Sequence, residues 1–420
     1  MIQVPCVDVT ALPLDARLLE FVQGEKARGR RVYLASTFDR RHVERLANQL
    51  GFYGVVAPAG GIESAQSWKA EYLQAEFGPG GFDYILGNDY DSESCQSARR
   101  IVASNCSPQA LRALARRCPD LTSLGSRQLR WKDYLSAMRL HQWSKNTLLL
   151  LPMLAGHAIT PSNIGVLTLA IASFSFTASS IYVVNDILDI ESDREHPTKK
   201  SRPFAAGLIP ITHGFFMATA LLLGGLATAA IVSPAFLGIV CLYFAASTAY
   251  SLFLKRTPIV DVLTLAGLYT WRLVGGAVAI AITLSPWMLA FSMFLFLCLA
   301  LVKRLTELKD RVDSGKGPPA GRGYLAEDLP LILALSCTAG YSAVVVLALY
   351  VNSSKVTELY SIPEGLWLAC GLLLYWITRA LLLANRGKMH CDPLVYALRD
   401  RVSVTTILLT GAVVLGSAII

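Results

Sequence analysis

Long apolar runs dominate the sequence from about residue 140 onward and limit the folds that this chain can adopt. Each run is roughly 20 residues long, the length needed to cross the hydrocarbon core of a bilayer. The nine runs cover residues 143–160, 163–184, 211–231, 234–254, 259–281, 286–302, 330–350, 364–384 and 403–420. The stretch LTLAIASFSFTASSIYVV (167–184) carries no charge on any face, which is atypical of a helix buried in a soluble protein. The sequence therefore predicts an all-α polytopic membrane bundle with nine transmembrane helices.

The composition of the chain agrees with a membrane protein. Of the 420 residues, 53% are hydrophobic and 16% are charged, whereas soluble domains have about 25% charged residues. Disordered, collagen-like and small disulfide-stapled chains are excluded by this balance. The 9 cysteines are scattered, with no Cys-x-x-Cys pair and no Cys/His cluster, so they predict neither a zinc site nor a disulfide framework.

Basic residues are distributed unevenly over the loops between the predicted spans. The loops that follow the second, fourth, sixth and eighth spans hold Arg194, Lys199, Lys200, Arg202, Lys255, Arg256, Lys303, Arg304, Lys309, Arg311, Lys316, Arg322, Arg386, Lys388, Arg399 and Arg401, and the other loops hold only Lys355. Because Lys and Arg mark cytoplasmic loops, we expect a multi-pass protein of the inner (cytoplasmic) membrane with its N-terminal part in the cytoplasm. The net charge of +8 then reflects topology and an anionic substrate, and nucleic acid is not an expected partner.

The first of these basic loops also carries an acidic cluster. The sequence VVNDILDIESDREHPTKKSRPFAAG (183–207) places Asn185, Asp186, Asp189 and Asp193 at the end of the second span. On a helix the three aspartates share one face, where their like charges favour a bound cation. Carboxylate oxygens suit Mg²⁺, which proteins often share with substrate phosphates, and Asn185 offers a further carbonyl oxygen. The cluster predicts a magnesium site.

Basic residues follow the aspartates directly. Lys199 and Arg202 are candidates to meet phosphate oxygens, together with Arg194 and Lys200. The alternative is a solvated loop whose positive charges only set topology. That alternative explains Lys and Arg but not three acids at helical spacing beside a membrane boundary, where ionisable groups are typical of functional sites. We therefore interpret the loop as a site for a magnesium-bound diphosphate.

The segment NDILDIESD (185–193) resembles the first aspartate-rich motif, NDxxDxxxD, of the UbiA-type intramembrane prenyltransferase superfamily. The resemblance implies nine transmembrane helices and a diphosphate donor held by Mg²⁺, with Asp186, Asp189 and Asp193 as the catalytic metal ligands. One branch, the decaprenyl-phosphate phosphoribosyltransferases, is more similar still. The similar segments are REHPTKKSRPFAAG (194–207), LHQWSKN (140–146), YSLFLKRTPIVDV (250–262), YTWRLVGGAVA (269–279), SPWMLAFSMFLFLCLALVKRLTEL (285–308) and DPLVYALRDR (392–401).

The loop after the sixth span departs from the wider superfamily. Members with aromatic acceptors usually carry a second aspartate-rich motif there, whereas this chain has Lys303, Arg304 and Glu307. The resemblance thus implies transfer of a 5-phosphoribosyl group from phosphoribosyl pyrophosphate to a polyprenyl (decaprenyl-type) phosphate, with release of pyrophosphate. Two alternatives stay open: transfer of an isoprenyl group from its diphosphate to an aromatic acceptor, and an inactive lipid-binding scaffold. Interfacial anchoring is the alternative role for the two basic residues.

Three further basic residues are candidates for substrate binding: Lys145 at the mouth of the first span, Lys255, and Arg272 inside the fifth span. An arginine at that depth normally faces a polar cavity, and Asp261 is its expected companion. For Arg399, Asp400 and Arg401 we expect a role in ordering the cytoplasmic loops.

The first third of the chain has the pattern of a soluble α/β domain. Residues 29–61 alternate strand, helix and strand, and FDYILGNDYD (82–91) is a further strand that ends in an acidic turn. This alternation predicts a small doubly wound domain and resembles haloacid dehalogenase-like phosphatases. The residues that the resemblance implies are a phosphate-binding hydroxyl, a lysine and metal-side acids, namely Ser36 or Thr37, Lys69, Asp89 and Asp91.

The nucleophile of that phosphatase family lies in a DxDxT motif, and here VDVTALPLD (7–15) supplies only Asp8 and Thr10. We therefore expect a degenerate α/β domain over residues 1–104. Residues 105–139 are interpreted as a connector that includes an amphipathic interfacial helix. The transferase domain is expected over residues 140–420, surrounded by the lipid bilayer, and a homo-oligomer is compatible with the sequence.

Overall fold

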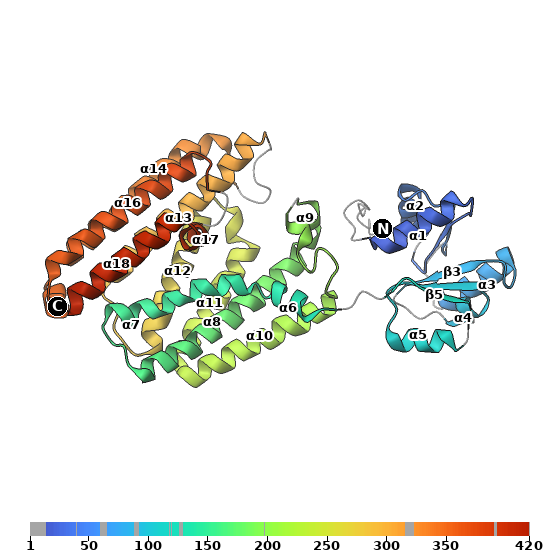
Figure 1. Cartoon of the computed structure of the whole chain (residues 1–420), viewed down its shortest axis with the longest axis horizontal. Helices are drawn as coiled ribbons and strands as arrows, with labels where there is room; N and C mark the ends of the chain where they lie inside the picture. Colours follow the sequence, from blue (N-terminus) through green and yellow to red (C-terminus); the bar gives the residue numbers. More distant parts are fainter. Residues whose placement is uncertain are drawn as a thin grey trace. The chain divides into compact units, whose positions relative to one another are not determined.

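The computed structural model describes residues 14–38, 40–58, 65–87, 92–116, 118, 120–125, 129–196, 198–315, 323–389 and 393–419. The chain forms two compact units. One comprises residues 1–134 and 189–210, and the other comprises residues 135–188 and 211–420. Figure 1 labels their helices and strands.

The first unit contains parallel strands joined by helices. Strand β1 (Tyr33–Ala35) pairs with β2 (Gly54–Val56), while β3 (Asp83–Leu86), β4 (Arg100–Ala103) and β5 (Leu121–Ser123) pair in that order. The helices are α1 (Ala16–Ala27), α2 (Arg40–Gln49), α3 (Ala65–Phe77), α4 (Ser92–Gln96) and α5 (Pro108–Ala115). Parallel neighbours need such crossover connections, so the predicted alternation of strands and helices is confirmed.

Strand β5 corrects the predicted boundary of this domain. Leu121 to Ser123 pair in register with Ile101 to Ala103 of β4, although residues 105–139 were interpreted as a connector. A three-residue strand of composition Leu-Thr-Ser has no alternation long enough to identify it. The α/β fold therefore extends past residue 104 to at least Ser123.

The structure describes only some of the residues that the phosphatase resemblance implies. Asp8, Thr10, Asp89 and Asp91 lie outside the described residues. The Ser36 hydroxyl accepts a hydrogen bond from the Phe38 amide at 3.2 Å, and the buried Lys69 ammonium lies 5.6 Å from the centre of the Tyr84 ring. The phosphatase-like interpretation of this domain stays a prediction.

An ion network ties α1 to β3 in the first unit. The Arg30 guanidinium bridges Glu25 at 2.8 Å and Asp83 at 2.6 Å. The hydrogen bond from Arg30 lowers the pKa of Glu25 below its usual 4.5. For Asp83, burial acts to raise the pKa, but the hydrogen bonds from Arg30 and Arg99 outweigh it and lower the pKa. The network attaches α1 to β3, an edge strand of the sheet β3-β4-β5.

The second unit is helical. Its long helices are α8 (Pro161–Leu188), α10 (Ile211–Val232), α11 (Pro234–Leu252), α12 (Val260–Ala279), α13 (Pro286–Asp313), α14 (Leu329–Val351), α16 (Leu366–Asn385) and α18 (Arg401–Ile419). Its shorter elements are η2 (Leu140–Leu150), α7 (Leu151–Ala155), η4 (Leu254–Arg256), η5 (Ala326–Asp328), α15 (Ser354–Leu359), η6 (Pro363–Gly365) and α17 (Pro393–Arg399), while α6 (Trp131–Ala137) crosses the boundary between the units. Within the described residues, 8 helices are long and apolar enough to cross a membrane.

The first predicted span, 143–160, is not one of these 8 helices. It folds as the 3₁₀-helix η2 followed by the short helix α7. The hydroxyls of Ser144 and Thr147 donate to carbonyls three residues earlier, at 3.0 and 2.8 Å, which matches the tighter 3₁₀ turn. The predicted count of nine transmembrane α-helices is therefore not confirmed.

Helices α8 and α10 pack closely through small residues. The hydroxyls of Ser173 and Ser180 donate to the carbonyls of Gly225 and Ala218 at 2.7 and 2.8 Å. A Cβ atom on Gly225 would lie 2.5 Å from the Thr177 hydroxyl, so the glycine permits the close approach. Small residues and interhelical hydroxyl bonds are typical of packing inside membranes.

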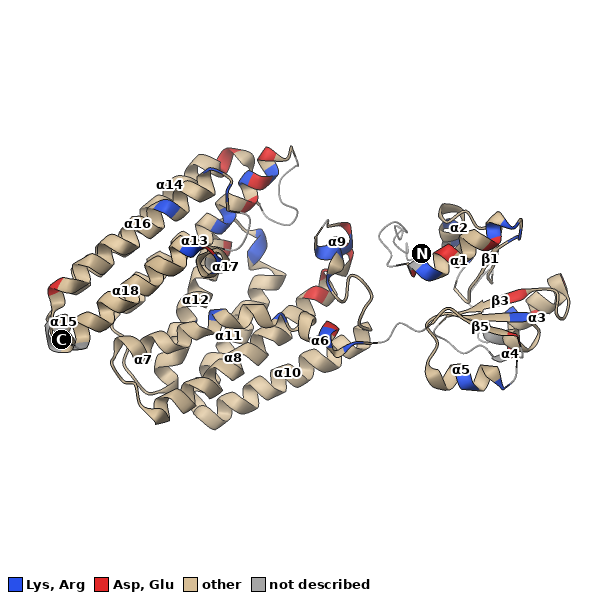
Figure 2. Ribbon diagram, viewed as in Figure 1, with Lys and Arg blue, Asp and Glu red and all other residues tan. Residues whose placement is uncertain are grey.

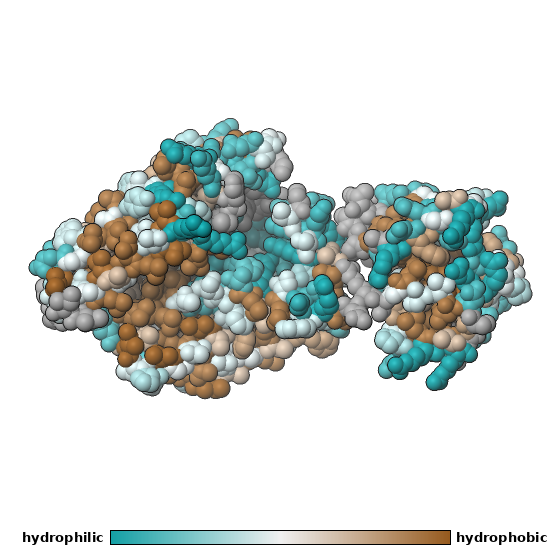
Figure 3. Space-filling view, in the orientation of Figure 1, coloured by the Kyte–Doolittle hydropathy of each residue, from teal (hydrophilic) through white to brown (hydrophobic). Residues whose placement is uncertain are grey.

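Charged and apolar side chains are separated in the helical unit. Lys, Arg, Asp and Glu gather where α13 ends and near α17, and they are sparse along the long helices (Figure 2). Hydrophobic side chains cover much of the visible flank of the same helices (Figure 3). A multi-pass membrane protein requires such a separation.

Candidate functional site

The acidic motif begins inside α8 and ends beyond it. Asp186, which is 2% exposed, lies in the last turn of α8. Asp189 has φ −94° and ψ 11°, and a second helix, α9 (Ile190–Glu195), carries Asp193. The expected continuous helical face is therefore wrong, since the helix is interrupted at Asp189. The boundary between the two units also passes between Leu188 and Asp189.

Asp186 binds an arginine that the sequence did not single out. The Arg139 guanidinium donates to the Asp186 carboxylate, and it also lies over the Tyr182 ring, 5.1 Å from the ring centre. Arg139 has a left-handed backbone, with φ 52° and ψ 51°, at the start of η2. In the sequence, Arg139 directly precedes the LHQWSKN segment (140–146), and this position could have indicated that it belongs to the site. Asn185 donates from Nδ2 to the Ser251 hydroxyl at 2.8 Å, which leaves its carbonyl oxygen as a further acceptor.

Side-chain hydrogen bonds connect α9 to the residues that follow it in the segment 189–210. The Asp193 carboxylate, whose side chain is 3% exposed, accepts a hydrogen bond from Arg202 at 2.6 Å. The Arg194 guanidinium donates to the Ala205 carbonyl at 3.1 Å. Arg202 therefore binds an acid of the motif, whereas Lys199 in η3 (Lys199–Ser201) is exposed.

The segment η2 is attached to α8 and α12 by side-chain hydrogen bonds. The buried Asn146 donates to the Ser175 hydroxyl at 2.9 Å and accepts from Arg272 Nε at 2.9 Å. Gly276 of α12 permits this contact, because a Cβ atom there would overlap the Leu149 carbonyl. The half-buried Lys145 lies 5.7 Å from the centre of the Tyr269 ring.

Arg272 is 5% exposed and directs its guanidinium at protein groups. Besides Asn146, it donates to the Leu268 carbonyl at 2.7 Å and to the Tyr243 hydroxyl at 2.8 Å. The expected pairing with Asp261 does not occur. In this structure Arg272 positions η2 against α11 and α12.

Asp261 pairs instead with Arg304 of α13, at 2.5 Å. Both side chains are buried, at 0% and 2% exposure. Arg304 also donates to Glu307 at 2.5 Å and to the Tyr250 hydroxyl at 3.1 Å. The predicted basic residues therefore differ in environment: Arg304 of α13 belongs to a buried network, while Lys303 of α13 and Lys255 of η4 are half-buried.

Positive charge surrounds His141 at the start of η2. Partial desolvation, and then the charges of Arg139, Lys145 and Arg399, lower the pKa of His141 below its usual value. Neutral imidazole is therefore favoured, and an anion bound among these cations would reverse the shift. His141, like Arg139, was not among the predicted site residues.

Asp400 orders the turn between α17 and α18. It accepts two hydrogen bonds from Arg379, at 2.7 and 3.1 Å, and caps α18 by accepting from the Ser403 amide at 2.8 Å. Its partner is thus an arginine of α16 and not one of its sequence neighbours. Burial opposes the shift, but these hydrogen bonds hold the pKa of Asp400 far below its usual value.

The carboxylates of the motif have the oxygen donors that Mg²⁺ takes, so the residue types fit a magnesium ion. No group of three or more His, Cys, Asp or Glu side chains within metal-binding reach occurs in the part of the chain that the structure describes. Arg139 and Arg202 are the cations that neutralise Asp186 and Asp193 here.

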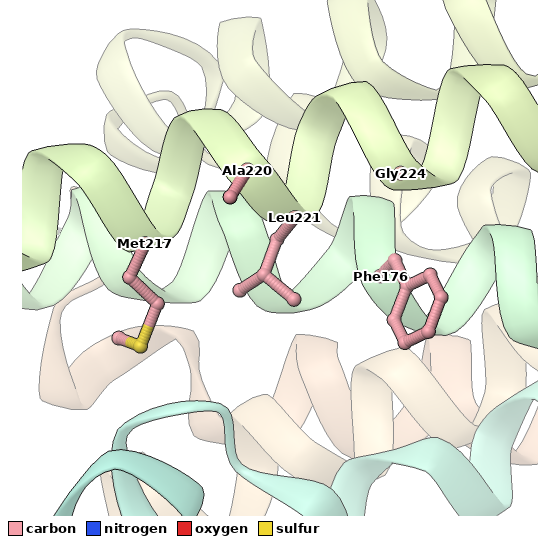
Figure 4. A pocket seen from close by; sticks show the side chains of 5 residues that line it. All are labelled: Phe176, Met217, Ala220, Leu221 and Gly224. Atoms are coloured by element: carbon pink, nitrogen blue, oxygen red, sulfur yellow. The ribbon is translucent and has the colours of Figure 1, made fainter.

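Two apolar cavities open on the flanks of the helical unit. One, of about 280 Å³, lies between α8 and α10 and is lined by Phe176, Met217, Ala220, Leu221 and Gly224 (Figure 4). The other, of about 330 Å³, is lined by α16 and α18 residues and has Arg401 as its charged member. The first has no charged lining residue, so it suits a hydrocarbon chain and not a phosphate.

Three curated relatives are similar to this chain. An uncharacterized protein, y4nM, of Sinorhizobium fredii is 32% identical over 410 residues, which cover 96% of this chain and 78% of the relative. The nodulation protein NoeC of Azorhizobium caulinodans is 36% identical over 66% of this chain and 90% of its own length. A decaprenyl-phosphate phosphoribosyltransferase of Mycobacterium tuberculosis is 32% identical over 64% of this chain and 88% of its own length.

The fold has a solved counterpart. A UbiA homolog from Archaeoglobus fulgidus, bound to GPP and Mg²⁺, superposes with a TM-score of 0.52 at 18% identity, over 67% of this chain and 99% of that one. The model of the UbiA prenyltransferase family matches residues 147–398. The chain therefore belongs to the UbiA prenyltransferase family of membrane-embedded transferases.

Proposed function

We propose that this protein transfers a 5-phosphoribosyl group from phosphoribosyl pyrophosphate to a polyprenyl phosphate and releases pyrophosphate. One observation carries the choice of donor. Where aromatic-acceptor members have a second aspartate motif, this chain has Lys303, Arg304 and Glu307, and Arg304 binds both Glu307 and Asp261 of α12. The half-buried Lys303 at this place suits the separate 5-phosphate of phosphoribosyl pyrophosphate better than a second metal-bound diphosphate. The relatives named decaprenyl-phosphate phosphoribosyltransferase support the same donor and acceptor.

The basic residues of the helical unit supply the binding groups for such a donor. Arg139, Lys145 and Arg399 concentrate positive charge around His141, and Lys255 of η4 and Lys303 of α13 are half-buried. A donor with a pyrophosphate and a separate 5-phosphate needs cations at more than one place. Arg272 and Arg304 act by holding the segments that carry these ligands.

Magnesium is proposed as the cofactor, held by Asp186, Asp189 and Asp193 with Asn185 as a further oxygen donor. The solved A. fulgidus homolog was determined with Mg²⁺ bound. When bound, it would stabilise the negative charge that develops on the leaving pyrophosphate. The bond from the ribose anomeric carbon to pyrophosphate breaks as a lipid phosphate oxygen attacks that carbon. Because the lipid phosphate is already an anion, the chain needs no strong general base.

The membrane setting determines how the acceptor is presented. The apolar cavities on the helix flanks suit the isoprenoid chain, and the charged end of the helical unit suits its phosphate (Figure 2). We place the protein in the inner membrane with its α/β domain in the cytoplasm, where phosphoribosyl pyrophosphate is made available. We further propose that this α/β domain is a degenerate phosphatase-like module.

A two-donor assay tests the proposal. Full-length protein in lipid nanodiscs is incubated with radiolabelled phosphoribosyl pyrophosphate and polyprenyl phosphate, and separately with a labelled isoprenyl diphosphate and an aromatic acid. Lipid-extractable label is expected only in the first reaction, and only with Mg²⁺. Label only in the second reaction would replace the proposal by aromatic prenylation. Label in neither would favour a lipid-binding scaffold.

A further inference from the structure

The side chain of Tyr324 holds a strained turn in place directly before α12. Ile259, directly before α12, has φ 67° and ψ −49°, and the Val260 amide donates to the Pro258 carbonyl at 2.8 Å. These values describe a γ-turn of the rare, strained type. A β-branched residue with positive φ persists only where the surroundings impose it.

The surroundings that impose this turn come from residues 323–324. The Tyr324 hydroxyl accepts from the Ile259 amide at 2.9 Å and donates to Asp261 Oδ1 at 2.5 Å. Burial, and then the hydrogen bond with Asp261, raise the pKa of Tyr324, so this hydroxyl stays protonated. Gly323 also packs against this turn, since a Cβ atom there would lie 2.8 Å from the Pro258 ring.

The same tyrosine connects the turn to the buried network of α13. Asp261 accepts from Tyr324 with one oxygen and from Arg304 with the other, at 2.5 Å each. Arg304 in turn holds Tyr250 of α11. One chain of hydrogen bonds therefore fixes both ends of the basic turn 251–259, which carries Lys255.

We propose that Tyr324 is a positioning residue that imposes the strained turn at Ile259 and thereby presents Lys255 to the phosphate groups of the donor. This inference rests on the proposed function only in that the donor carries phosphate groups. Tyr324 itself does not touch the substrate. Its loss is expected to weaken donor binding and to leave the chemical step unchanged.

The variant Tyr324→Phe removes both hydrogen bonds and keeps the ring. Tyr350→Phe is the matched control, because Tyr350 lies at the far end of α14 and makes no hydrogen bond through its side chain among the described residues. Gly323→Ala is a second variant, which places a Cβ atom against Pro258 of the same turn.

Hydrogen–deuterium exchange on the full chain in nanodiscs tests the turn without any substrate. Peptides that cover residues 254–260 are expected to exchange faster in Tyr324→Phe and Gly323→Ala than in wild type and in Tyr350→Phe. Unchanged exchange in Tyr324→Phe would overturn the inference. This result does not depend on which donor the enzyme uses.

Kinetics test the connection to Lys255. With whichever phosphorylated donor the wild type accepts, Tyr324→Phe should raise the KM for the donor about fivefold and leave kcat within about twofold. In a Lys255→Ala background the same change should add nothing, because the two residues act as one unit. A fully additive effect, or a loss confined to kcat, would overturn the positioning role. Use of an isoprenyl diphosphate as donor would contradict the proposed function but not this inference. If neither donor reacts, the hydrogen–deuterium exchange of residues 254–260 decides whether Tyr324 imposes the turn.

Discussion

At the scale of single residues, the aspartates of the motif differ in accessibility. Asp193 is buried against Arg202, and Asp186 is buried against Arg139, whereas Asp189 is half-buried at the interruption between α8 and α9. A magnesium ion must compete with two arginines for the buried pair. Asp189 is the most accessible of the three, so substitution there tests metal binding with the least disturbance of buried side chains.

The variant Asp189→Asn should lower kcat/KM at least about 100-fold, because a weakened metal site loses the stabilisation of the leaving group. The apparent Mg²⁺ requirement, measured as the half-maximal concentration, should rise in parallel. Asp310→Asn on the exposed end of α13 is the matched control and should behave as wild type. Full activity and an unchanged Mg²⁺ requirement in Asp189→Asn would remove Asp189 from the metal site.

His141 gives the donor site a pH dependence with a definite sign. In the free protein its pKa is lowered by desolvation and by Arg139, Lys145 and Arg399. A bound phosphate would raise that pKa, so binding takes up a proton and the KM for the donor should fall as the pH is lowered from ~8 to ~6. The donor phosphates also titrate in this range and contribute to the change of KM with pH. His141→Gln should remove the remaining contribution and so make the dependence of KM on pH weaker. Identical profiles for the two proteins would show that the donor does not approach His141.

At the scale of elements, the contact between η2 and α12 depends on one missing side chain. Gly276→Ala would force a Cβ atom into the Leu149 carbonyl, and overpacking of this kind costs about 1–3 kcal/mol. We expect a lower Tm in detergent and reduced transfer, because Lys145 and Asn146 are carried by η2. Gly267→Ala on the same helix meets no atom within 4 Å and should leave both unchanged. Equal Tm values for the two variants would contradict the close contact.

The limits of prediction also lie at the scale of elements. Apolar runs located the 8 long helices because burial in lipid requires that composition along a whole element. They could not distinguish η2 from an α-helix, since both are apolar and differ only in which carbonyl each amide reaches. The pairing of Asp261 with Arg304 was missed for another reason: the two residues are 43 positions apart and meet only through helix packing. Asp186 was found by its motif, but its partner Arg139 was not.

At the scale of the whole molecule, α13 provides a test of orientation. The helix has 28 residues, and its ends are marked by the exposed residues Thr283 and Ser314. At 1.5 Å per residue it is about 42 Å long, which exceeds the hydrocarbon core, so its ends should lie on opposite sides of the membrane. The positive-inside rule predicts that the Ser314 end, with Lys303, Lys309 and Arg311, lies in the cytoplasm.

Single-cysteine additions to the natural sequence measure this orientation in intact cells. A membrane-impermeant maleimide should label the Thr283→Cys variant before lysis and the Ser314→Cys variant only after lysis, with peptide mass spectrometry separating the new label from that on native cysteines. The physical reason is that a sulfonated maleimide does not cross the bilayer. The reverse pattern would place the basic turns outside the cell, away from a cytoplasmic phosphoribosyl donor. The proposed reaction would then lack its substrate, so this experiment tests the topology and the function together.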